Sequence, residues 1–115
     1  MEVDQVSLRT PLHEKLVEVL SGELPLVVAE QRVYYQPPEG YKLEYPCIIY
    51  ELSKRVSMRA NNKNYLKNQV YSIKYITENS DSDIPELLEE TLDNSSFERV
   101  FTTEGLYHYI YKTYI

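Results

Sequence analysis

The chain ends in Leu106-Tyr107-His108-Tyr109-Ile110-Tyr111-Lys112-Thr113-Tyr114-Ile115, a stretch in which aromatic and β-branched residues recur at alternate positions. Such alternation is typical of a β-strand. One face would carry the odd-numbered residues, and the opposite face is not wholly polar either. We therefore expect helices of the chain to cover one face and another molecule to cover the other, as in a β-rich protein that assembles.

Further apolar or alternating stretches predict the remaining strands, at residues 32–35, 47–52, 69–77 and 97–102. The residues Thr103-Glu104-Gly105 predict a tight turn that pairs the last two strands as a hairpin. Residues 24–29 are apolar but contain Pro25, so they predict either a packed connector or a weak strand.

Two short helices are also predicted. Thr10 would cap the first helix, with Pro11 at its first position. Its apolar residues share one helical face, namely Leu12, Leu16, Val19 and Leu20. The second helix follows Asp83, which forms a capping-box pattern with Glu86 and precedes apolar residues at helical spacing.

These elements fit one domain, because the chain has 115 residues. We expect an N-terminal arm over residues 1–9 and a single domain over residues 10–115. The predicted fold class is α+β, with a mainly antiparallel sheet of about four to five strands and two short helices packed on one face.

The formal net charge of −6 disfavours a surface built to grip nucleic-acid phosphates. It is compatible with a wall past which DNA slides, because an acidic wall repels phosphates. The single cysteine, Cys47, has apolar neighbours and is expected to be a buried thiol in a reducing compartment. Neither a signal peptide nor a membrane span is expected.

No pattern of catalytic, metal-binding or cofactor-binding residues is apparent. The two histidines, His13 and His108, have no ligand partners at metal-site spacing, and the three glycines are isolated. Glu86, Glu89 and Glu90 are expected to form the solvated face of the second helix. We therefore expect a protein that is not an enzyme and has no cofactor.

Residues 53–68 hold a concentration of positive charge and of asparagine. Asparagines at this density predict a loop, although the flanking strands could extend into it as a long hairpin. This segment is either an ordinary solvated loop or an arm that contacts an acidic partner. The tyrosines either fill the core or serve an interface, which tyrosine favours. The candidate interface residues are Lys54, Arg55, Arg59, Asn61, Asn62, Lys63, Tyr65, Lys67, Tyr107, Tyr109 and Tyr111.

Several stretches resemble one family of viral proteins. They are YPCIIYE at 45–51, ANNKNY at 60–65, YSIKYIT at 71–77, SDSDIP at 80–85, FERVF at 97–101 and GLYHY at 105–109. Together they are similar to the small neck proteins of tailed bacteriophages of the tail-terminator, or tail-completion, kind. The resemblance extends over about residues 10–115, nearly the whole chain, and includes the order of helices and strands.

The resemblance implies a structural protein of the virion neck, assembled in the cytoplasm of a host bacterium. Such proteins form a ring, typically a hexamer, that caps the tail tube, ends its elongation and joins it to the head connector or stopper protein. DNA passes through the ring without sequence-specific binding, and no membrane is involved. Residues 55–67 would form an inter-subunit or tube-facing arm, and no catalytic residues are implied.

Two alternative functions stay open. The first is a head-side adaptor or stopper protein of the same neck. The second is a small cytoplasmic protein-binding regulator, which predicts a monomer or dimer in place of a ring.

Overall fold

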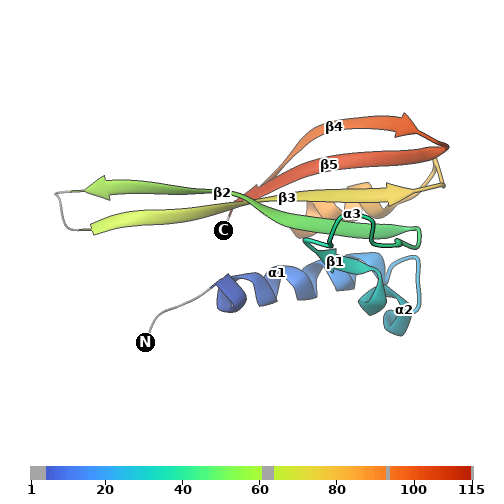
Figure 1. Cartoon of the computed structure of the whole chain (residues 1–115), viewed down its shortest axis with the longest axis horizontal. Helices are drawn as coiled ribbons and strands as arrows, with labels where there is room; N and C mark the ends of the chain where they lie inside the picture. The colour runs from blue at the N-terminus through green and yellow to red at the C-terminus, as the bar shows by residue number, and fades with distance from the viewer. Residues whose placement is uncertain (1–4, 61–63, 93, 115) are drawn as a thin grey trace.

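The computed structural model describes the backbone of residues 5–60, 64–92 and 94–114, and the side chains of 11–54, 69–92 and 94–114. Figure 1 shows one sheet with helices along it. The elements in chain order are α1 (Gln5–Leu20), α2 (Leu26–Gln31), β1 (Val33–Tyr35), β2 (Cys47–Ala60), β3 (Asn64–Thr77), α3 (Ile84–Thr91), β4 (Ser95–Thr103) and β5 (Leu106–Tyr114).

The strands form one five-stranded sheet in the order β1-β2-β3-β5-β4. β1 runs parallel to β2, and the other neighbours are antiparallel. This arrangement confirms the predicted α+β fold with a mainly antiparallel sheet. The structure adds a third, six-residue helix, α2, to the two helices expected.

The core lies between the helices and one face of the sheet. Leu16 of α1 and Leu88 of α3 are fully buried against the sheet residues that point the same way, which include Ile48, Tyr50, Ile73, Tyr75 and Tyr111. The helices cover the odd-numbered face of the last strand, a choice between its two faces that the alternation alone does not make. Burial of these large side chains provides most of the driving force for folding.

The β4–β5 hairpin closes as predicted. Thr103 pairs with Leu106, so Glu104 and Gly105 form a two-residue loop. Both loop residues have positive φ, 52° and 76° respectively. This is the pattern of a type I′ turn, whose twist matches that of the flanking strands and which glycine adopts without steric cost.

Two predictions near the N-terminus were wrong in detail. Residues 26–31 form helix α2, so the interpretation of residues 24–29 as a connector or weak strand does not hold. Pro25 directly precedes this helix, and its carbonyl accepts a hydrogen bond from the Ala29 amide at 2.9 Å. Proline is compatible with a helix start, and a six-residue apolar run is too short for its periodicity to distinguish helix from strand.

Helix α1 also begins earlier than predicted, at Gln5 and not at Pro11 after a Thr10 cap. It therefore takes in residues 5–9 of the expected N-terminal arm, and residues 1–4 lie outside the described part of the chain. Pro11 is inside the helix, where it removes one backbone hydrogen bond. The predicted buried face is present, since Leu12, Leu16 and Leu20 all lie in the core.

The start of α3 is capped by a residue from a distant part of the chain. Asp83 makes no side-chain cap, so the capping box predicted with Glu86 is absent. Instead, a carboxylate oxygen of Glu23 accepts hydrogen bonds from the Ser82 hydroxyl at 3.0 Å and from the Asp83 amide at 3.1 Å. The Ser82 hydroxyl also shares a hydrogen bond of 2.7 Å with Tyr75. This network links the end of α1, the sheet and α3.

Replacing Glu23 with alanine should therefore lower the free energy of unfolding by about 1 kcal/mol, the usual effect of losing a helix cap. Urea denaturation of wild type and E23A would measure the loss. The matched control is Glu30→Ala, because Glu30 is an exposed glutamate in α2. Equal stability of the E23A and E30A variants would show that the Glu23 network does not stabilise the fold.

Candidate functional site

Strands β2 and β3 continue past the body of the protein as a two-stranded ribbon (Figure 1). The last pairing of β5 with β3 is Tyr114 with Val70, and the last pairing of β1 with β2 is Tyr35 with Tyr50. Pairing of β2 with β3 alone continues to Ala60 and Asn64. We call residues 55–60 and 64–69 the arm. It makes the molecule long, with extents of 50 × 29 × 28 Å.

The arm accounts for most of the basic segment predicted as a loop. The loop prediction was wrong for residues 53–60 and 64–68, and the long hairpin named as its alternative is present. The missed signal is the alternation of Val56 and Met58 with polar residues, which is typical of a strand. Asn61, Asn62 and Lys63 lie outside the described residues.

The register of the arm gives the position of each candidate residue in its backbone. Arg55 lies opposite Gln69, Lys67 opposite Ser57, and Arg59 opposite Tyr65. The side chains of these four candidates lie outside the described part of the chain, whereas the candidate Lys54, at the base of the arm, has an exposed side chain.

The arm leaves the body at an irregularity in β2. The pairing register shifts between Leu52 and Lys54, so Ser53 has no partner of its own in β3. Bulges of this kind bend a strand and increase its twist. Just before this point, the Gln36 side chain accepts a hydrogen bond from the Leu52 amide at 3.2 Å. The arm therefore begins directly after a part of β2 that a hydrogen bond holds to the segment following β1.

Charge is distributed unevenly between the arm and the rest of the chain. The chain has 12 basic and 18 acidic residues. Residues 54–68 contain 5 of the basic residues and none of the acidic ones, which leaves 7 basic and 18 acidic residues elsewhere, or −11. The body is therefore strongly acidic, and the segment that projects from it is strongly basic.

The opposite edge of the sheet is open. β4 is nine residues long, and within the part of the chain that the structure describes its one neighbour in the sheet is β5. It exposes three large apolar side chains, with Phe97 49%, Val100 47% and Phe101 36% exposed. A long edge strand with exposed apolar residues readily pairs with another chain unless it is protected. β4 is thus a second candidate interaction surface, which the sequence did not single out.

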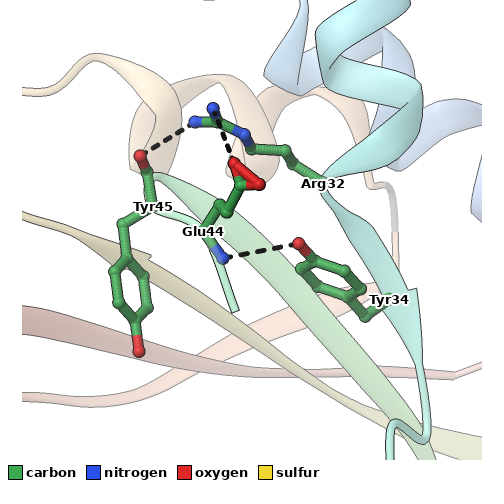
Figure 2. Close-up of polar contacts among 4 residues, drawn as sticks. All are labelled: Arg32, Tyr34, Glu44 and Tyr45. Carbon is green, nitrogen blue, oxygen red and sulfur yellow. Dashed lines mark hydrogen bonds and ion pairs between the residues drawn. The ribbon is translucent and has the colours of Figure 1, made fainter. Parts of the chain in front are cut away.

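The other edge strand, β1, is only three residues long. Residues at its start contact the end of the segment that connects β1 to β2. Figure 2 shows that the Arg32 guanidinium donates a 2.8 Å hydrogen bond to the Tyr45 carbonyl and lies 3.6 Å from the Glu44 carboxylate. The Glu44 amide donates to the Tyr34 hydroxyl at 3.5 Å. These contacts hold the connection between β1 and β2, so β4 is the longer and more accessible edge.

An acidic segment lies beside β4. Residues 78–90 carry six carboxylates and no basic residue, and all six side chains are exposed. Glu86, Glu89 and Glu90 are thus on a solvated face, as predicted. The Phe97 ring packs against Tyr111 at 5.4 Å, and the Tyr111 hydroxyl donates to Glu89 at 3.2 Å. This chain of contacts places the acidic helix α3 next to the edge strand.

The three candidate tyrosines of β5 differ in how much surface they expose. Tyr107 and Tyr109 are half-buried, whereas Tyr111 is only 1% exposed. The Tyr111 hydroxyl donates to the Pro85 carbonyl at 3.3 Å, and burial, with the Glu89 carboxylate nearby, raises its pKa well above the usual range. Tyr111 therefore fills the core of its own chain and presents almost no surface to a partner.

His108 lies on the face of the sheet without helices. Its ring stacks on Phe101 with centroids 4.7 Å apart, and both ring nitrogens are buried without a hydrogen-bond partner in the described part of the chain. Burial lowers the pKa of His108, the charge of Lys74 lowers it further, and Glu104 opposes the shift. The folded protein therefore favours the neutral imidazole.

This lowered pKa predicts a dependence of stability on pH. The unfolded chain binds a proton to His108 at a higher pH than the folded chain does, so stability is complete above the unfolded pKa of about 6.5 and declines as the pH falls below it. We expect the free energy of unfolding to decrease as the pH is lowered from 7.5 to 5. Urea denaturation across this range measures it.

The control is His108→Phe, which keeps an aromatic ring beside Phe101 but cannot titrate. His13 is unchanged in both proteins, so the difference between their pH profiles isolates His108. The H108F variant should show the flatter profile. Identical slopes for the two proteins would contradict the assignment.

Among the described residues, no group of three or more His, Cys, Asp or Glu side chains could hold a metal ion. Within the same residues, no helix is long and apolar enough to cross a membrane. Neither the protein-family models nor the curated proteins gave a match to this chain.

Proposed function

We propose that this protein is a structural component of the neck of a tailed bacteriophage. It forms a ring at the head–tail junction, caps the tail tube, ends tube elongation and joins the tube to the head connector while DNA passes through. The observation that carries the proposal is the combination, in one small chain, of an acidic body, a projecting basic arm and an open edge strand.

The arm supports the proposal that the chain assembles with other copies. A two-stranded ribbon is at best marginally stable in water, and a third strand or a packed surface stabilises it. The arm and the β4 edge are different surfaces of the same chain. Contacts between two different surfaces are heterologous, and such contacts close into a ring when the rotation between subunits allows it.

The resemblance to tail-terminator proteins supports the location in the neck. Its stretches at residues 45–51 and 71–77 lie in β2 and β3, and those at residues 97–101 and 105–109 lie in the β4–β5 hairpin. These strands would form the frame of the ring. The acidic body also fits the passage of DNA, because carboxylates facing the lumen repel phosphates and keep the duplex from binding.

Native mass spectrometry of the purified chain, with and without the tail tube protein of the same virus, tests the proposal. We expect a ring of about six copies, at least when the tube protein is present. A chain that stays monomeric or dimeric in both samples would overturn the ring and favour a protein-binding regulator.

Two parallel pull-downs test the position of the protein in the neck. One uses the tail tube protein as bait, and the other uses the head-side connector. Retention by the tube supports a tail terminator. Retention by the head-side connector alone would assign the chain to a head-side adaptor or stopper.

A further inference from the structure

We infer that the arm of one copy pairs along β4 of a second copy, so that the sheets of neighbouring subunits become continuous. This inference rests on one part of the proposed function, namely that copies of the chain assemble with one another. It names the two surfaces that meet at the subunit boundary and the backbone pairing that joins them.

The receptor surface is the open edge of β4. β5 lies on one side of this nine-residue strand, and no other strand of the described residues lies on its outer side. Phe97, Val100 and Phe101 are exposed along the same strand. Addition of an extended strand to such an edge provides main-chain hydrogen bonds, and the neighbouring side chains provide specificity.

The occupant is the arm of another copy, because a chain's own arm does not lie beside its β4. In the sheet order, β5 and β3 separate β4 from the arm strand of β2, and the arm runs beyond the last β3–β5 pair at Val70 and Tyr114. Figure 1 shows the arm projecting from one end of the body, whereas β4 runs beside β5 toward the opposite end. Contact between the two surfaces therefore requires a second molecule.

Charge complementarity favours the arm as the occupant over a second β4 strand. The described residues of the arm include Arg55, Arg59 and Lys67 and no acidic residue, and α3, beside β4, carries Glu86, Glu89 and Glu90 and no basic residue. An arm lying along β4 would bring these segments together. Pairing of β4 with β4 of another copy would instead place two acidic segments near one another. Complementary charge steers the encounter and suppresses the like-charged alternative.

Chemical cross-linking between two differently tagged batches of full-length chain tests the inference. One batch carries Ser57→Cys in the arm strand of β2, and the other carries Ser96→Cys in β4. The batches are mixed before assembly and treated with a short bismaleimide. The native Cys47 is fully buried, and burial raises its pKa to about 12, so it should remain an unreactive thiol. A third batch with Glu18→Cys, at an exposed position of α1, replaces the S96C batch as the control.

We expect the S57C–S96C product to form and the S57C–E18C product to be weak. An oligomer in which S57C fails to cross-link to S96C would overturn the inference and leave the proposed ring in place. A chain that stays monomeric with and without the tube protein would overturn both. An arm–β4 product in an oligomer that does not bind the tail tube would support the inference and reject the proposed role as the cap of the tail tube.

A substitution in β4 tests the same contact without a probe. Val100→Lys places a positive charge on the edge that would receive the basic arm, and it should weaken self-association roughly tenfold or more. The matched control is Val27→Lys, because Val27 is 65% exposed on α2 and undergoes the same chemical change. Far-UV circular dichroism and thermal melts check that both variants fold. Equal self-association of V100K and V27K would overturn the inference.

Discussion

Replacing residues 55–69 with Asn-Gly should yield a folded monomer that no longer assembles. Lys54 and Val70 are register partners, so the dipeptide would close β2 and β3 as a two-residue hairpin of the kind that Asn-Gly favours. The core strands, up to Leu52 in β2 and from Val70 in β3, are retained. The change removes four of the five basic residues of segment 54–68 and the whole ribbon, so loss of assembly should be complete at concentrations where the wild type is fully assembled.

Size-exclusion chromatography with light scattering would measure the mass, and a thermal melt would measure stability. The control is Arg55→Gln with Arg59→Gln and Lys67→Gln in the full-length chain, because it keeps the ribbon but removes three of its charges. We expect this control to assemble weakly and to lose the salt dependence of wild type. An arm-less chain that assembles as wild type does would refute the assembly role of the arm.

Leu16→Ala should cost about 3 kcal/mol of the free energy of unfolding, within the range for truncating a buried leucine. Leu16 is fully buried in the cluster that joins α1 to the sheet and α3. Removing its side chain loses transfer free energy and leaves a cavity among side chains that are held by the strands. Total stability of a domain this small is typically only about 5–15 kcal/mol, so the loss would be a large fraction of it.

Urea denaturation would measure this loss, and Leu26→Ala is the matched control. Leu26 is 58% exposed on α2, so the same truncation there should change stability by about 0.5 kcal/mol or less. An L16A variant as stable as L26A would mean that α1 does not pack on the sheet as described.

Local sequence patterns predicted most of the elements. The alternation at residues 47–52, 69–77 and 106–115 identified the core of the sheet, because strand residues alternate between faces whatever their neighbours are. The hairpin turn at Glu104-Gly105 was equally local, since the required positive φ favours glycine.

Where prediction failed, the deciding interactions were between distant segments. The capping pattern of Asp83 and Glu86 was present in the sequence, but Glu23 caps α3 from 60 residues away. The roles of the tyrosines of β5 were similarly undetermined: Tyr111 is buried under α3, whereas Tyr107 and Tyr109 retain exposed surface. The alternation within a strand does not predict which of its residues a helix will bury most.

By itself, the sequence determined the α+β class, the order of most strands and helices, and the concentration of positive charge in residues 54–68, because periodicity and charge are properties of neighbouring residues. Only the tertiary structure decided that this charge is carried on a projecting ribbon and that β4 is left as an open edge beside the acidic α3. The physical reason is that strand order and pairing depend on which distant segments meet, and those contacts are not encoded in any single stretch of the chain.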